Sequence, residues 1–149
     1  MDEIKKPYDK KPQSRLKKIG GSDSMEIGRV IPQAVELEEA VLGALMLDQD
    51  AVNDIIDVLS ADSFYKESHQ KIFEAIQSLF QNSEPIDILT VNQELIKRGQ
   101  LDFVGGPQFI AHLTNRVASA ANVEFHGRII SQKHILRELI RISTETIRD

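Results

Sequence analysis

Apolar side chains recur at spacings of three and four residues from Ile31 onward, which is the period of an amphipathic helix and not of a strand. Pro32 is expected in the first turn of the first helix, and Ser60–Tyr65 is expected to form a turn with a single helical turn inside it. The pattern predicts helices over residues 32–47, 49–59, 69–82, 88–98, 107–117 and 122–149. We therefore expect an all-α fold, in which a compact multi-helix head is followed by one long helix.

Local signals indicate where several of these helices begin and end. Asp48 or Asp50 can cap the second helix, and Asp87 is a favourable N-cap for the helix over residues 88–98. Gly99 follows the same helix at the position where a left-handed backbone conformation commonly ends a helix. The side chains of this helix that we expect to face the core are Ile88, Val91, Leu95 and Ile96.

The last helix is unusual, because its apolar residues cover more than one narrow stripe. At 1.5 Å per residue it would be about 40 Å long. Its apolar side chains are Ile129, Ile130, Ile135, Leu136, Leu139, Ile140, Ile142 and Ile147. One side can pack on the head, whereas the other requires a return helix, a second subunit or a partner protein. Since the pattern stops abruptly at Asp149, we expect a fragment of a longer protein; the alternative is a natural helix that frays at its end.

Charge is distributed unevenly along the 149 residues, whose formal net charge is −5. Residues 1–24 carry seven basic and four acidic side chains, whereas residues 25–124 carry six basic and sixteen acidic ones. We expect residues 1–28 to form a flexible basic leader, which is either a solvated segment or an arm that binds nucleic acid. The acidic body argues against binding of a phosphate backbone by the body itself, and it suits a partner with a basic face.

Several kinds of chemistry are excluded by what the sequence lacks. There is no cysteine, and no glycine is followed by lysine, so a disulfide, a Cys-based zinc site and a nucleotide-binding Gly-Lys-Ser/Thr loop are all absent. His126 and His134 lie eight residues apart on the last helix and are not expected to hold a metal ion, and His69 is expected to pack or to form a hydrogen bond within a turn. Carboxylate pairs such as Glu38-Glu39 are expected at helix starts and on solvent faces. We therefore expect a binding module, with no catalytic, cofactor or metal residues.

The cellular location of the protein can be predicted from the same sequence. No apolar run approaches the ~20 residues that span a bilayer. The lysine-rich start lacks the apolar segment of a secretory signal. A cytoplasmic protein without a membrane partner is expected.

Residues 30–149 resemble the N-terminal domain of bacterial replicative DNA helicases of the DnaB type. Each matching segment is short, but their order and spacing are specific when taken together. The segments that carry the resemblance are 31–33, 36–48 (Glu-Leu-Glu-Glu-Ala-Val-Leu-Gly-Ala-Leu-Met-Leu-Asp), 64–65, 69–76, 84–91 (Glu-Pro-Ile-Asp-Ile-Leu-Thr-Val), 105–106 and 119–130.

The resemblance implies a helical head over residues 29–121 and the first helix of a helical hairpin over residues 122–149. In such helicases these domains form a collar of paired subunits on a ring of six, through which single-stranded DNA passes. The collar binds DNA primase and, in some systems, a helicase loader. ATP and Mg²⁺ are expected only at a motor domain that this chain lacks, so the chain itself is expected to be non-catalytic although its parent is an ATP-dependent helicase.

Three residues are implied as partner contacts by the same resemblance. Phe109 follows the Gly-Gly pair, and Ile140 and Ile147 lie on the long helix. Phe109 also falls on the buried period of its own helix, so packing in the core is an equal interpretation.

Two positions depart from the family pattern. Ala34 stands where a small hydroxyl residue usually caps the first helix, which weakens the cap by about 1 kcal/mol. Ala118 stands in a loop that usually contains proline.

Two alternative functions remain. The first is a small helical regulator that binds DNA through the basic arm, and the second is an unrecognised helical enzyme.

Overall fold

The computed structural model describes residues 31–117 and 120–148, and every regular element in these residues is a helix. The predicted leader over residues 1–28 and the departure at Ala118 lie outside the described residues. The elements are α2 (Val35–Leu47), α3 (Gln49–Ile55), the 3-10 turn η1 (Ala61–Ser63), α4 (Glu67–Gln81), α5 (Ile88–Lys97), α6 (Leu101–Val104), α7 (Gly106–Asn115) and α8 (Val123–Arg148). The all-α prediction is confirmed.

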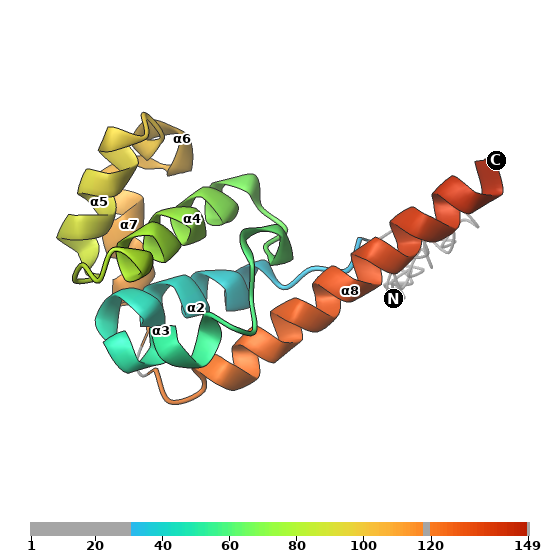
Figure 1. Cartoon of the computed structure of the whole chain (residues 1–149), viewed down its shortest axis with the longest axis horizontal. Coiled ribbons are helices and arrows are strands. Elements are labelled where there is room, and N and C mark those ends of the chain that lie inside the picture. The colour runs from blue at the N-terminus through green and yellow to red at the C-terminus, as the bar shows by residue number, and fades with distance from the viewer. Residues whose placement is uncertain (1–30, 118–119, 149) are drawn as a thin grey trace, which may run out of the picture. The chain divides into compact units, whose positions relative to one another are not determined.

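Helix α2 lies at the centre of the head and packs against α4, α7 and α8 (Figure 1). Its buried side chains include Val41, Leu42 and Leu45. Gly43 lies at a close contact between α2 and α7, where a Cβ would collide with the main-chain carbonyl of Leu113. The other helices complete the head, α4 packing on α5 and α3 packing on α8.

The core is built from the apolar stripes that the sequence pattern predicts. The rings of Phe64 and Phe73 pack with their centroids 5.0 Å apart. The largest fully buried side chains are Phe64, Phe73, Leu42, Leu45, Ile55, Ile72, Ile76, Leu95, Ile110, Leu113, Ile130 and His69. None of the helices in residues 31–117 and 120–148 combines the length and the apolar character needed to cross a membrane.

The residues predicted to cap or end α3 and α5 are confirmed. Asp48 caps α3, accepting a hydrogen bond from the main-chain N–H of Asp50 at 2.9 Å. Asp87 accepts one from the N–H of Thr90, whose hydroxyl in turn accepts from the N–H of Asp87. Gly99 follows α5 with φ of 68°, as its position predicts. Ala34 precedes α2 without a side-chain cap.

Four details of the prediction are wrong. The first helix begins at Val35 and not near Pro32, whose carbonyl binds a distant arginine instead. Ile96 is 61% exposed, because α5 buries only the narrow stripe of Val91 and Leu95 and Ile96 projects about 100° away from it. The short helix α6 was not expected, since four residues are too few to show a period. In addition, α3 ends at Ile55, short of the predicted boundary.

Candidate interaction surface

The segment between η1 and α4 is the junction on which the polar contacts of the head converge. Ser60 and Ser63 form a capping box around η1, and the side-chain amide of Gln70 donates to the carbonyl of Phe64 at 2.8 Å. Helix α4 begins after Lys66, a residue whose side chain makes no capping bond. The main-chain N–H groups at this junction therefore need acceptors from elsewhere in the chain.

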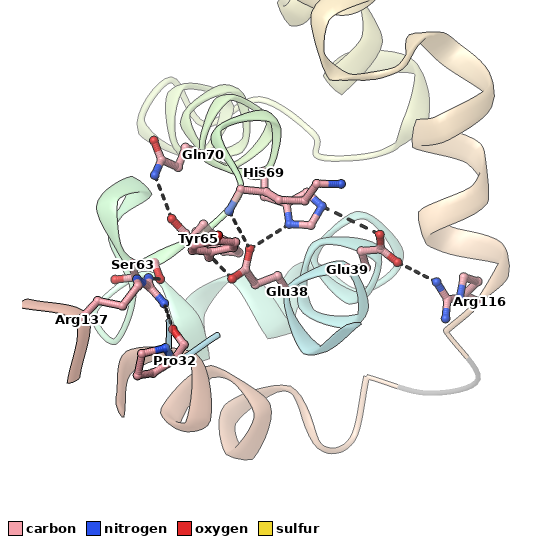
Figure 2. A network of polar contacts seen from close by, with 11 residues as sticks. Pro32, Glu38, Glu39, Ser63, Tyr65, His69, Gln70, Arg116 and Arg137 are labelled. Carbon is pink, nitrogen blue, oxygen red and sulfur yellow. Dashed lines mark hydrogen bonds and ion pairs between the residues drawn. The ribbon is translucent and has the colours of Figure 1, made fainter. Parts of the chain in front are cut away.

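Glu38 of α2 supplies that acceptor from inside the head (Figure 2). Its carboxylate accepts from the N–H of Tyr65 at 2.9 Å and from Nδ1 of His69 at 2.8 Å. An ionised carboxylate only accepts hydrogen bonds, so with Glu38 ionised the donor in this pair is Nδ1 of His69. With an exposed fraction of only 1%, Glu38 corrects the expectation that the Glu38-Glu39 pair lies on a solvent face. The expected packing role of His69 is confirmed, but its hydrogen-bond partner is Glu38 on α2 and not a group within the expected turn.

The polar contacts continue from His69 to the end of α7. Nε2 of His69 lies 4.0 Å from a carboxylate oxygen of Glu39, whose other oxygen accepts from Arg116 at 2.6 Å. The ring of Phe109 stacks on the imidazole of His69, with centroids 6.3 Å apart and planes 8° apart. Figure 2 shows the line of contacts from Glu38 to Arg116. This network joins α2, α4 and α7, so its geometry indicates a structural role.

One signal in the sequence could have revealed Glu38. It lies four and seven residues before Leu42 and Leu45, which are buried, and so it falls on the inward stripe of α2. A charged residue on an apolar stripe requires a buried partner. Which residue serves as that partner is not visible from the sequence, because His69 follows thirty-one positions later.

Helix α8 contacts the head along one stripe. Val123 and Ile130 are buried, and Gly127 allows close approach, since a Cβ there would lie 2.5 Å from Cδ1 of Ile55. Arg137, seven residues beyond Ile130 on the same stripe, donates to the main-chain carbonyls of Pro32 and Ser63 at 2.9 and 2.8 Å.

The opposite face of α8 is apolar and exposed. We call six residues the α8 apolar surface, each with an exposed fraction between 45% and 85%: Ile135, Leu136, Leu139, Ile140, Ile142 and Ile147. At about 100° per residue these side chains span an arc of about 160°, centred opposite the stripe that packs on the head. The predicted two-sided apolar pattern is therefore confirmed, one side being covered by the head and the other being open.

Charged residues continue the head-facing stripe beyond Arg137. Arg141 donates to Glu138 at 2.9 Å and to Glu145 at 2.9 Å. The guanidinium of Arg141 holds the pKa of Glu138 below its usual value, mainly through this hydrogen bond. The two carboxylates in turn raise the pKa of Arg141. A stripe of ion pairs is compatible with water, so the apolar surface is the side of this segment that is suited to a partner.

The three predicted partner contacts occupy different parts of the structure. Ile140 and Ile147 belong to the α8 apolar surface and are 51% and 85% exposed. Phe109 is half-buried on α7, between His69 and His112. Figure 1 places α7 far from the C-terminal end of α8. The structure thus brings Ile140 and Ile147 together on one helix and does not bring Phe109 to them.

No group of three or more His, Cys, Asp or Glu side chains within the described ranges is arranged to hold a metal ion. The recesses next to α8 are shallow and open, and one of about 340 Å³ is lined by Ile31, Tyr65, Arg137, Glu138, Ile140 and Arg141.

Comparison with known proteins agrees with this architecture. A crystal structure of the N-terminal domain of DnaB helicase from Mycobacterium tuberculosis superposes with a TM-score of 0.77 at 34% identity, covering 80% of this chain and 86% of that one. The replicative DNA helicase DnaB of Rhodothermus marinus is 47% identical over 119 residues, which are 80% of this chain. That of Geobacillus stearothermophilus is 41% identical over 121 residues, which are 81% of this chain.

The match covers only part of these relatives. The chain spans 12% of the length of the Rhodothermus marinus protein and 27% of that of the Geobacillus stearothermophilus protein. Residues 30–132 match the family described as DnaB-like helicase N terminal domain, which is more than half of the chain. The chain therefore belongs to the family of DnaB-like helicase N-terminal domains.

Proposed function

We propose that this chain is the N-terminal collar domain of a hexameric replicative DNA helicase, and that it pairs subunits through the α8 apolar surface. The observation that carries the proposal is the position of that surface, directly opposite the stripe that packs on the head. Six apolar side chains on one exposed helix face favour burial against another surface, because removing them from water is favourable. A helix of a second copy offers the same apolar face in return.

We further propose that the paired domains bind DNA primase and, in some systems, a helicase loader. Ile140 and Ile147 are the proposed contacts on α8, and Phe109 is the proposed contact on the head. The acidic body, with six basic and sixteen acidic residues over positions 25–124, supports a protein partner with a basic face. In this proposal ATP, Mg²⁺ and single-stranded DNA are bound by the assembled parent helicase.

Light scattering at several concentrations tests subunit pairing. The unmodified chain is expected to form dimers or larger assemblies, and Ile140→Glu and Ile147→Glu are expected to weaken association at least tenfold, because a carboxylate would be buried without a partner. Leu89→Glu is the matched control: Leu89 is 65% exposed on α5, remote from α8. A chain that stays monomeric at every concentration would contradict the pairing role.

Titration of the C-terminal domain of a DNA primase tests the second part of the proposal. Phe109→Ala, Ile140→Glu and Ile147→Glu should each weaken primase binding, whereas Leu89→Glu should not. Equal affinity for all four variants would contradict the proposed contacts while leaving subunit pairing to be judged by light scattering.

A further inference from the structure

Arg137 holds α8 against two separate segments of the head. One terminal nitrogen of its guanidinium donates to the carbonyl of Pro32, before α2, and the other donates to the carbonyl of Ser63, in η1. The guanidinium carbon also lies 5.6 Å from the centre of the Tyr65 ring. Figure 2 shows the side chain reaching from α8 into this junction.

The acceptors of Arg137 are main-chain carbonyls and not carboxylates. A main-chain carbonyl has no rotamers and moves only when the backbone that carries it moves. The planar guanidinium presents several donors at fixed angles and can engage two such groups at once, which an ammonium group on a flexible stem does less well. Arg137 is therefore suited to fixing the direction of α8 relative to the head, in addition to holding α8 against the head.

Arg137 lies beyond the buried residues that anchor α8, so its contacts increase the length of helix that is fixed to the head. The buried anchors Val123 and Ile130 are seven residues apart, so they fix the helix over only about 10 Å. Arg137 extends the fixed length by a further seven residues, or about 10 Å. Residues 139–147 beyond it are all exposed.

We propose that Arg137 is a positioning residue, which sets the direction in which α8 leaves the head and thereby the placement of the α8 apolar surface. Ile147 lies about 25 Å along the axis from Ile130, so a tilt of about 20° at Ile130 would displace it by about 9 Å. The two carbonyl contacts at Arg137 oppose such a tilt. Any consequence for subunit pairing rests on the proposed function, whereas the direction of α8 does not.

Distances between spin labels on the head and on α8 test the inference directly. The chain has no cysteine, so Gln93→Cys on α5 and Thr144→Cys on α8, both exposed positions outside the α8 apolar surface, provide a unique pair of labels. Labelled chains are diluted with unlabelled chains so that only distances within one molecule are measured. Arg137→Met should broaden or shift the distance distribution, and Arg137→Lys should broaden it partly.

Arg128→Met is the matched control. Arg128 lies on the same helix, is well exposed and pairs with Glu124 of α8 itself, so its loss should leave the distribution unchanged. Circular dichroism and the melting temperature show whether each variant remains folded. Arg137 variants that are folded and keep the narrow distribution of the unmodified chain would overturn the positioning role.

Light scattering on the same variants separates the two proposals. A broadened distribution with weakened association supports both. A broadened distribution with undiminished association supports the positioning role and counts against the α8 apolar surface as the pairing surface. An unchanged distribution with weakened association overturns the positioning role and leaves the proposed pairing in place.

Discussion

Glu38 and Arg137 hold the same junction from two sides. Glu38 binds the N–H of Tyr65 from inside the head, and Arg137 binds the carbonyl of Ser63 from α8. Both contacts use a charged side chain to satisfy main-chain groups that no helix or strand satisfies. The conformation of residues 60–66 therefore depends on side chains that lie outside the segment.

Replacement of Glu38 by Gln is expected to lower the free energy of unfolding by about 2–4 kcal/mol, because the carboxylate is buried and its hydrogen bonds are to donors only. The amide of Gln would place its own donors against the N–H groups or the imidazole. Urea denaturation measures the change. Glu36→Gln, at an exposed position in the same turn, should change the free energy by no more than about 0.5 kcal/mol. Equal effects of both substitutions would argue against the network as a stabilising feature.

At the scale of elements, close approach between α2 and α7 depends on the absence of a side chain at Gly43. The nearest atoms to a Cβ there are the carbonyl of Leu113, which belongs to the backbone of α7, and a methyl group of Val117. A backbone carbonyl cannot move aside without displacing its helix. Gly127 of α8 differs, because the atom nearest to a Cβ there is the terminal methyl group of Ile55.

Gly43→Ala is therefore expected to destabilise the protein by about 1–3 kcal/mol, although Ala is favoured over Gly within a helix by about 1 kcal/mol. Gly127→Ala is the comparison, and it should be less harmful because the end of the Ile55 side chain can shift. Thermal and urea unfolding measure both variants. A Gly43→Ala protein at least as stable as the unmodified chain would show that the two helices can separate at little cost.

At the scale of the whole molecule, α8 consists of a part that packs on the head and a part that is exposed. The head-facing residues up to Arg137 pack against α2, α3 and η1, whereas residues 139–147 are all exposed. A helix without tertiary contacts is marginally stable in water, since propensity and ion pairs such as Arg141–Glu145 contribute only a few tenths of a kcal/mol each. The distal part of α8 should therefore be the part of the described chain whose helical structure is stabilised most by association.

Hydrogen exchange of backbone amides tests this expectation. Amides of residues 139–147 should exchange much more slowly at a concentration where the chain is paired than at one where it is monomeric. Amides in the middle of α4, around Ile72 and Phe73, should show no such dependence because they are buried in the head. Exchange of residues 139–147 that is independent of concentration, in a chain that does associate, would place the pairing surface elsewhere.

The sequence alone determined the features that depend on near neighbours in the chain. Asp48, Asp87 and Gly99 act on residues within a few positions of themselves, and the helical period of α8 is visible as a spacing. The family resemblance, which rests on short segments in order along the chain, is confirmed by the match of residues 30–132 to the family. The roles of Phe109, Ile140 and Ile147 as partner contacts stay predictions.

Only the tertiary structure decided which faces are covered and which distant groups meet. Glu38 binds His69 across thirty-one positions, and Arg137 binds Pro32 across one hundred and five. Ile96 satisfies the same local pattern as Leu95 but faces water, because α5 is packed on one side only. Hydrophobic spacing shows that a side chain can be buried, whereas the neighbouring element determines whether it is.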